Sequence, residues 1–370
     1  MTSPQKLNII LIGGGLIGPR HALSINSNPS LHLLALIDPA PHGPQTASSL
    51  STLHFSSLTS HLTSLSSTTP KPDAAIICTP NHTHVPIALQ LIAAGIHILI
   101  EKPISTSIPE GIQLISAARE KGVRVLAGHH RRFNPYLLAA KRTLDAKTLG
   151  KVIAVQGTWC LLKPSSYFNN GGEWRRSSES GGVILINLVH ELDLLQYLLG
   201  PIVCVSATET AKTRGFDAEE GAAVIMKFES GVVGTFLVGD STPSPWNFEG
   251  GTGENPMVPR VEEGEGVGGF YRIMGTEGSL SVPDLRVWRG EWDQVLKKEE
   301  VRVQEGRVPF DDQMEHFRSV VREGVKPMCS AEEALSAMVV CEAVKVAMRT
   351  GMWVDIEGFE VRVRDGSDRK

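Results

Sequence analysis

The stretch LNIILIGGGLIGPR (residues 7–20) decides the fold of the first half of the chain. Residues 7–12 form a short apolar run, which is typical of a buried strand, and a helix is predicted from about Pro19. Between them, Gly13, Gly15 and Gly18 satisfy the spacing GxGxxG. The first glycine permits a tight turn, the second lets the backbone approach a pyrophosphate, and the third lets helix and strand pack closely. Because a helix amino end offers unpaired N–H groups to phosphates, the sequence predicts a dinucleotide site over residues 13–18, with Leu16 and Ile17 contributing backbone.

Asp38 closes the second apolar run, LHLLALID (31–38), 20 residues after Gly18. An acidic residue at this distance is typical of one that binds the adenosine ribose. A carboxylate accepts hydrogen bonds from ribose hydroxyls but repels a 2′-phosphate, and no Arg or Lys follows in DPAPHGP. NAD is therefore expected as the cofactor in preference to NADP. The alternative is that Asp38 is only a turn residue before Pro39.

Further apolar runs alternate with helical patterns as far as residue 128. Alternating strands and helices predict a parallel, doubly wound sheet with right-handed crossovers, which we interpret as a Rossmann domain over residues 1–128. The Ser- and Thr-rich residues 46–69 are expected to form a surface helix and loop. The other runs are strands at 73–80, 96–100 and 123–128 and helices at 85–94 and 109–121.

After about Gly150 the pattern changes to strand-like runs separated by turns. Residues 222–229 and 232–239, joined at Ser230-Gly231, predict a β-hairpin. The second domain, 129–370, is thus expected to be α+β with an open-faced, mainly antiparallel sheet. Helices are predicted at about 181–199, 311–324 and 331–351, and the last can pack back on the first domain. The loop-rich residues 240–269 are expected to be mobile, as lids commonly are.

Two polar segments follow strands of the parallel sheet, at the edge that lines the ligand crevice of such folds. Thr79-Pro80-Asn81-His82-Thr83-His84 follows the third strand, and Thr79, Pro80, Asn81 and His84 are expected to contact the cofactor. His82 and His84 lack a partner Cys, Asp or Glu at ligand spacing, so we expect no metal. Glu101-Lys102-Pro103 follows the fourth strand. Proline keeps Lys102 extended, so Glu101 and Lys102 are placed beside the cofactor and Lys102 is a candidate for proton transfer; the alternative is a lysine in a solvated loop.

Composition excludes several classes of protein. The net charge is −4 and the pI about 6.3, so a nucleic acid meets no overall attraction. Five scattered cysteines without CxxC spacing indicate reduced thiols rather than a disulfide framework. Since no segment approaches the roughly 20 apolar residues that span a bilayer, we expect no membrane partner and a cytoplasmic location.

Taken in order, GGGLIG, Asp38, TPNHTH and Glu101-Lys102-Pro103 resemble the Gfo/Idh/MocA oxidoreductases. The resemblance continues through GHHRRFNP (128–135), the GG…H…D segment at 181–193 and the SAEEAL…EAV helix, and so covers almost the whole chain. It implies a Rossmann domain with an open-faced sheet domain, a nicotinamide cofactor, and sugar, cyclitol or related alcohol substrates. It also implies a homodimer or homotetramer that buries the open sheet face. GGVILINLVHELD further resembles a subgroup that includes fungal quinate-utilisation oxidoreductases.

The resemblance also implies catalytic roles for Lys102 and His190. The family commonly has Asp four residues before this His, where this chain has Ile186; Asn187, three residues before, shares a helix face with His190 and can orient a hydroxyl but not carry a proton. Burial and the oxidised nicotinamide would lower the pKa of Lys102 toward a useful base. His190 has the alternative of being a satisfied helix histidine. Two candidate substrate contacts are His130 and Arg132, whose alternative role is to bridge the two domains. The others are Lys163, Tyr167, Trp174, Arg176 and Trp246, with Asn255 in the same loop as Trp246, and their alternative is ordinary loop packing.

Three functions are compatible with this sequence. The first is an NAD-dependent dehydrogenase or ketone reductase acting on a polyhydroxylated ring. The second is redox-neutral, with transient oxidation by tightly held NAD permitting epimerisation or elimination. The third is a non-catalytic nucleotide-sensing regulator, against which the presence of Lys102 and His190 argues.

Overall fold

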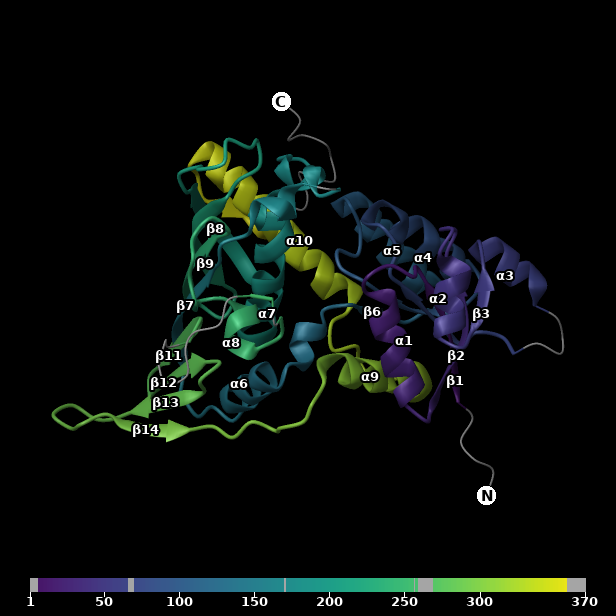
Figure 1. The fold of residues 1–370 in the computed structure, drawn as a ribbon. Helices are drawn as coiled ribbons and strands as arrows, with labels where there is room; N and C mark the ends of the chain where they lie inside the picture. Colours follow the sequence, from purple (N-terminus) through teal and green to yellow (C-terminus); the bar gives the residue numbers. More distant parts are fainter. Residues whose placement is uncertain (1–5, 66–69, 170, 256, 259–268, 358–370) are drawn as a thin grey trace, which may run out of the picture. The chain divides into compact units, whose positions relative to one another are not determined.

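The computed structural model describes residues 6–65, 70–169, 171–255, 257–258 and 269–357. The chain divides into two compact units (Figure 1). The first contains residues 1–133 and 307–336, and the second contains residues 134–306 and 337–370. The division therefore crosses the long helix α10 (Ala331–Thr350), between Ser336 and Ala337.

The first unit contains a six-stranded sheet in the order β3-β2-β1-β4-β5-β6, with every neighbouring pair parallel. The strand order reverses between β1 and β4, which is the place where such sheets bind their ligands. The strands are β1 (Leu7–Ile12), β2 (Leu31–Ile37), β3 (Leu53–Phe55), β4 (Ala74–Ile77), β5 (His97–Ile100) and β6 (Val125–Ala127). The helices are α1 (Gly18–Ser27), α2 (Gly43–Ser49), α3 (Leu58–Ser64), α4 (His84–Ala93), α5 (Ile108–Lys121) and α9 (Pro309–Glu323), with one-turn segments η1 (Asn81–Thr83) and η2 (His130–Phe133).

The predicted parallel, doubly wound sheet is confirmed, with one correction. Residues 46–69 were expected to form a helix and loop, but Leu53–Phe55 form the edge strand β3, which pairs with Ala35–Ile37. The side chains of β3 are exposed or half-buried. An edge strand needs only one partner and little apolar content, so it lacks the apolar run that identifies the buried strands.

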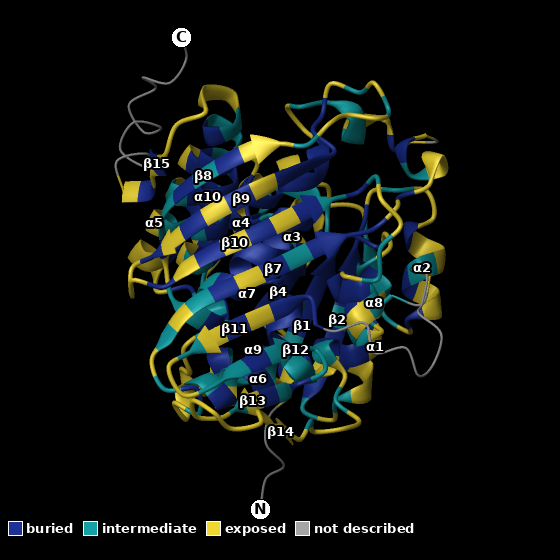
Figure 2. Ribbon diagram, turned by 90° about the vertical axis from the view of Figure 1, so that its left-hand side faces the viewer, coloured by how far each residue is buried: buried dark blue, intermediate teal, exposed yellow. Residues whose placement is uncertain are grey.

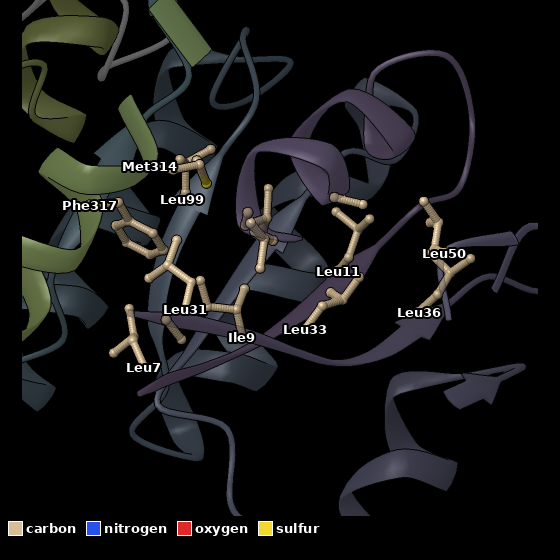
Figure 3. Close-up of a cluster of buried hydrophobic side chains, with 14 of the residues drawn as sticks. Leu7, Ile9, Leu11, Leu31, Leu33, Leu36, Leu50, Leu99, Met314 and Phe317 are labelled. Atoms are coloured by element: carbon tan, nitrogen blue, oxygen red, sulfur yellow. The ribbon is translucent and has the colours of Figure 1, made fainter. Parts of the chain in front are cut away.

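One cluster of the core of the first unit lies on one face of this sheet. Leu7, Ile9 and Leu11 alternate along β1 and are fully buried (Figure 3). They pack with Ile25 of α1 and with Met314 and Phe317 of α9. Burying a side chain of this size stabilises the fold by about 1.5–3 kcal/mol. Helix α9, more than 180 residues later in the sequence than β6, therefore belongs to the core of the amino-terminal sheet.

The second unit contains a nine-stranded sheet in the order β14-β13-β12-β11-β7-β10-β9-β8-β15. Its pairs are antiparallel except for β7 and β10, which are parallel. The strands are β7 (Val152–Cys160), β8 (Ile202–Glu209), β9 (Gly221–Phe228), β10 (Val233–Gly239), β11 (Tyr271–Gly275), β12 (Ser279–Val282), β13 (Arg286–Arg289), β14 (Lys297–Glu300) and β15 (Val354–Asp355). The expected hairpin is confirmed as β9 and β10, which pair from Gly221 with Gly239 to Lys227 with Val233.

One face of this second sheet is exposed. Buried and exposed residues alternate along β9 and β10 (Figure 2). Val224, Met226 and Phe236 face inward, whereas Ile225 and Leu237 are nearly half exposed. The period of two places one row of side chains on each face, so the predicted open-faced, mainly antiparallel sheet is confirmed.

Helical segments of the second unit connect these strands. Helix α6 begins at Asn134-Pro135, where the Asn134 side chain accepts a hydrogen bond from the backbone N–H of Tyr136; our sequence analysis did not predict it. The segments are α6 (Pro135–Asp145), η3 (Ser165–Phe168), η4 (Glu173–Arg176), η5 (Ile184–Leu188), α7 (Val189–Leu199), α8 (Phe248–Thr252) and most of α10. Helix α8 falls within the expected lid, residues 240–269, of which residues 256 and 259–268 lie outside the described residues.

Two expectations from composition can be compared with the fold. All five cysteines are free thiols, as predicted. In the part of the chain that the structure describes, no helix is both long and apolar enough to cross a bilayer.

Candidate active site

The glycine loop between β1 and α1 has three glycines with different physical requirements. Gly13 adopts φ +100°, and a Cβ there would lie 2.6 Å from the carbonyl oxygen of Cys78. A Cβ on Gly18 would lie 2.1 Å from the Gly13 carbonyl oxygen, so this position needs glycine for helix–strand packing. A Cβ on Gly15 would meet nothing within 4 Å. The fold thus leaves space at Gly15, as close approach of a pyrophosphate requires.

The amino end of α1 is also open to an anion. Its N-cap residue, Ile17, gives the helix no side-chain cap, whereas Ser57 caps α3 and Ser107 caps α5. The first N–H groups of a helix have no partner within the helix, and together with the helix dipole they attract phosphate. Leu16, in the same loop, is wholly exposed. The glycine loop therefore fits a dinucleotide as the sequence predicts.

Asp38 lies directly after β2 and is buried. Its Oδ2 accepts a hydrogen bond from the backbone N–H of Gly14 (2.6 Å), and its Oδ1 accepts one from Ala40 (2.8 Å). These two bonds tie the carboxylate to the glycine loop. Since each carboxylate oxygen can accept more than one hydrogen bond, both can also accept from ribose hydroxyls.

His84 joins the two loops that follow β4 and β5. Its Nδ1 lies 2.7 Å from the Pro103 carbonyl oxygen and its Nε2 lies 2.8 Å from that of Thr79. Burial lowers the pKa of His84, against the opposing effect of the two carbonyls. Because both ring nitrogens are engaged, we assign His84 to holding the loops together rather than to touching a cofactor or a metal. Thr79, Pro80 and Asn81 lie in the loop that it holds and at the start of η1.

Glu101 supports the residue beside it, Lys102. Its carboxylate is buried, with Oε1 2.8 Å from His21 Nε2 and Oε2 3.3 Å from the backbone N–H of Lys102. Burial raises the pKa of Glu101. The hydrogen bond with His21 and the charges of His21, His130 and Lys102 lower this pKa by more, so the net shift is downward. Glu101 therefore stays ionised and bonded within the protein, and Lys102, itself half-buried, lies on a braced loop at the carboxyl end of β5.

The two candidates after β6 are engaged inside the first unit. Arg132 is buried, and its Nη1 donates to the Met328 carbonyl oxygen (2.7 Å) and to the Glu333 carboxylate (3.1 Å). The His130 ring stacks on Phe310, with ring centroids 4.6 Å apart. We therefore assign Arg132 a structural role instead of a contact with substrate.

In the second unit, Asn187 and His190 lie on consecutive helical segments, η5 and α7, and both are buried. η5 has the wide π-helical turn, a feature found frequently at functional sites. Gly182, with φ +83°, begins this region, and a Cβ there would lie 2.1 Å from a carboxylate oxygen of Glu219. That carboxylate accepts a hydrogen bond from the backbone N–H of Ile184 (3.0 Å). The Gly181-Gly182 pair thus lets Glu219 cap the segment that carries Asn187.

Lys163 and Asn187 form one buried contact. The Lys163 ammonium donates to Asn187 Oδ1 (2.5 Å) and lies 3.7 Å from Asp240 Oδ2. The parallel pairing of β7 with β10 ends both strands at the same edge, and the backbone N–H of Lys163 donates to the Asp240 carbonyl oxygen (3.0 Å). Lys163 Nζ also lies 4.5 Å from the centre of the Tyr167 ring. Burial lowers the pKa of Lys163 to about 8.

The other candidates lie around this contact or further out. Arg175 lies over the rings of Tyr167 and Trp174, at 4.2 and 4.9 Å. Arg176 donates to the carbonyl oxygen of Phe168 (2.8 Å), which occupies part of its guanidinium. Trp174 and Trp246 are more than 40% exposed. Asn255 accepts a hydrogen bond from the backbone N–H of Met257 (3.0 Å).

Sequence reasoning missed several residues of these clusters. Asp240 carried a usable signal, because it is a polar residue directly after the apolar strand β10. His21 and Arg214 carried none: His21 meets Glu101 80 residues away, and Arg214 donates to Asp240 (2.6 Å) from a loop. Such contacts depend on the tertiary fold alone.

The glycine loop, the buried aspartate after β2 and the parallel sheet together define a dinucleotide-binding protein of the Rossmann class. The chain belongs to the Gfo/Idh/MocA oxidoreductase family. Residues 7–129 match the family's model described as "Oxidoreductase family, NAD-binding Rossmann fold", and residues 141–356 match that of its "C-terminal alpha/beta domain". The protein is thus an NAD-dependent oxidoreductase.

Named relatives cover most of the chain at low identity. Scyllo-inositol 2-dehydrogenase (NAD(+)) of Bacillus subtilis is 28% identical over 78% of this chain and 79% of its own length. Levoglucosan dehydrogenase of Pseudarthrobacter phenanthrenivorans is 27% identical over 75% and 73%, respectively. The 2,7-anhydro-N-acetylneuraminate hydratase of Escherichia coli is 25% identical over 65% and 64%.

Among solved structures, an oxidoreductase from Agrobacterium radiobacter in complex with NAD+, L-tartaric acid and magnesium shares the fold. Its TM-score is 0.79, with 14% identity over 96% of this chain and 99% of that chain. The WlbA dehydrogenase from Bordetella pertussis, in complex with NADH and UDP-GlcNAcA, has a TM-score of 0.72, with 22% identity over 95% and 99%.

Proposed function

We propose that the protein transfers hydride between NAD and a secondary alcohol or ketone carbon of a sugar, cyclitol or related cyclic hydroxy compound. Lys102 is the general acid and base, assisted by His190, and Asn187 orients a substrate oxygen. One observation carries the proposal. Lys102 stands at the carboxyl end of β5, on a loop that His84 ties to the loop after β4, beside the switch point where the glycine loop binds the dinucleotide.

Besides the cofactor, the reaction requires one side chain that accepts or donates a proton. In the oxidative direction, NAD held by the glycine loop and Asp38 would accept the hydride of the alcohol carbon, and the Lys102 amine takes the hydroxyl proton. In the reductive direction, the Lys102 ammonium returns that proton to the carbonyl oxygen. A positioned acid or base of this kind contributes typically about 10²–10⁴-fold in rate. The braced Glu101 carboxylate fixes the loop from which Lys102 acts.

The proposal is supported by the names of relatives that act on inositol and levoglucosan. The test is a screen of the full chain with NAD and scyllo-inositol, levoglucosan or quinate, and with NADH and 1,5-anhydro-D-fructose, following NADH by absorbance. Lys102→Ala should lower kcat by 10²-fold or more while NAD still binds. Lys141, which is partly exposed and pairs with Asp145 on α6, supplies the matched control Lys141→Ala. Turnover that survives Lys102→Ala would contradict the role of Lys102.

A redox-neutral reaction is the second candidate, favoured by the similarity to a hydratase. Asn187 cannot carry a proton. The proposed site therefore has two groups that can transfer one, Lys102 and His190, instead of three. Here the hydride leaves the substrate and returns to it within one turnover. Product formation without net NADH would select this candidate over the dehydrogenase.

We further propose that the chain forms a homodimer or homotetramer through the open face of the second sheet. That face carries Ile225, Val233, Leu237 and Met274, all at least 37% exposed. Exposed apolar side chains on an open sheet face are the kind of surface that oligomers bury. Light scattering coupled to gel filtration measures the mass, and a monomer at micromolar concentration would contradict this proposal.

A further inference from the structure

The contact between Lys163 and Asn187 fixes which way the amide of Asn187 points. An ammonium has only N–H donors, so the atom 2.5 Å from Lys163 Nζ is the amide oxygen, and the amide nitrogen Nδ2 lies on the other side. Within the described part of the chain, Nδ2 has no hydrogen-bond partner, and the residue as a whole is 9% exposed. The protein thus holds two N–H donors in one orientation without using them.

Lys163 is itself held in place from several sides. Its backbone N–H donates to Asp240, its ammonium lies near the Asp240 carboxylate, and the rings of Tyr167 and Trp159 lie 4.5 and 5.5 Å from Nζ. Arg214 Nη1 lies 2.6 Å from Asp240 Oδ1, so the Asp240 carboxylate is already paired with an arginine. The neutral amide of Asn187 is therefore the direct hydrogen-bond acceptor of Lys163, and donation to its oxygen polarises the amide and strengthens its N–H groups as donors.

We propose that Lys163 is a positioning residue that locks Asn187 as a hydrogen-bond donor to an acceptor oxygen of the substrate, a carbonyl or carboxylate oxygen. The inference rests on the proposed function and deepens it, because it gives the substrate a required chemical group. A site built to donate discriminates strongly against a ligand that lacks the acceptor, since its donors are then left unpaired.

The lock depends on the charge of Lys163. A neutral amine can accept a hydrogen bond as well as donate one, so loss of the proton allows the amide to rotate and turn its N–H groups inward. The pKa of Lys163, about 8, places this change just above neutral pH. Burial is the main cause of the low value. The charged groups that act on Lys163 are Asp240 and Glu249, which raise the pKa, and Arg175 and Arg214, which lower it; Tyr167, whose pKa burial raises, lies beside them.

Three variants separate the lock from simple packing. Lys163→Arg keeps a permanent donor, Lys163→Met keeps the length without a donor, and Asn187→Asp keeps the size without N–H groups. We expect kcat/KM for the substrate from the screen to fall roughly tenfold in Lys163→Met and more in Asn187→Asp. Lys163→Arg should be partly active and should lose the alkaline limb near pH 8. The Kd for NADH should be unchanged in all three, as in Lys141→Met.

A second readout needs no substrate. With asparagine side chains labelled with ¹⁵N in the full chain, the Asn187 NH2 signals, assigned by their absence in Asn187→Asp, should shift with an apparent pKa near 8. They should not shift in Lys163→Arg. The inference is overturned if Lys163→Arg keeps the alkaline limb of the wild-type pH profile and its Asn187 NH2 signals still titrate. If Lys102→Ala remains active while the Lys163 variants behave as expected, the proposed role of Lys102 fails and the lock stands.

Discussion

Replacing Gly15 by alanine should separate cofactor binding from folding. A Cβ on Gly15 meets nothing within 4 Å, and its φ lies outside the left-handed region. The apo protein should therefore be as stable as the wild type, or more stable by about 0.4–1 kcal/mol because the unfolded chain loses freedom. For a chain of this size, the rise in Tm should not exceed about 4 °C.

The same methyl group should interfere with the pyrophosphate. It would hold the phosphates away from the loop and from the amino end of α1. A hydrogen bond to a charged group is worth about 1.5–3 kcal/mol, so each one lost should raise the Kd for NAD by roughly 10- to 100-fold. At 100 times the wild-type Kd, NAD should stabilise the wild type by about 2.7 kcal/mol. The same concentration should stabilise Gly15→Ala by much less.

Gly18→Ala is the matched comparison, because its Cβ would lie 2.1 Å from the backbone oxygen of Gly13. Backbone cannot move aside cheaply, so overpacking should cost about 1–3 kcal/mol even without NAD. Calorimetric titration with NAD and thermal unfolding of both apo variants measure the two effects. The reasoning is refuted if Gly15→Ala binds NAD normally, or if its apo form unfolds below that of Gly18→Ala.

Four further outcomes are expected. Asp38→Asn removes the charge that two backbone N–H groups and the ribose share, so the Kd for NAD should rise about 10-fold or more and the preference over NADP should narrow in parallel titrations; equal discrimination would contradict this. His84→Ala unties the loops after β4 and β5, so kcat should fall while the hairpin strands of the second unit keep wild-type hydrogen-exchange protection. Because the folded pKa of Lys163, about 8, lies below the ordinary lysine value of 10.5, the unfolded chain binds more protons between these values, and the free energy of unfolding should rise with pH there by about 3 kcal/mol. Denaturant titrations of Lys163→Met should lack this rise. Leu237→Glu, on the open sheet face, should lower the mass seen by light scattering without lowering NAD affinity.

Local sequence was sufficient for the parts of the fold in which one short stretch carries the physics. Leu7–Ile12 with the glycines, and the apolar runs before Asp38 and Glu101, predicted the parallel sheet and its ligand edge. The strands of the hairpin were predicted because their alternation continues through Ser230-Gly231. By contrast, β3 was missed because an edge strand needs little apolar content, and α6 was missed although Asn134-Pro135 is a usual helix start.

The residues of the candidate site also divide into those that local sequence could predict and those that it could not. The positions of Gly13, Gly15, Gly18 and Asp38 at the sheet edge could be predicted from spacing, because they lie in one strand–turn–helix and at the end of the strand that follows it. For His84 and Arg132 the sequence left a ligand contact and a structural role open. The structure engages both with protein carbonyl oxygens and, for Arg132, a carboxylate.

What the sequence alone determined about this protein is the identity of its dinucleotide-binding half, because backbone dihedral requirements and strand periodicity act between near neighbours. What only the tertiary structure decided is which polar side chains are paired. Lys163 meets Asn187 across 24 residues and Glu101 meets His21 across 80. Burial makes such pairs matter, since a desolvated charge must find its partner wherever the fold places one.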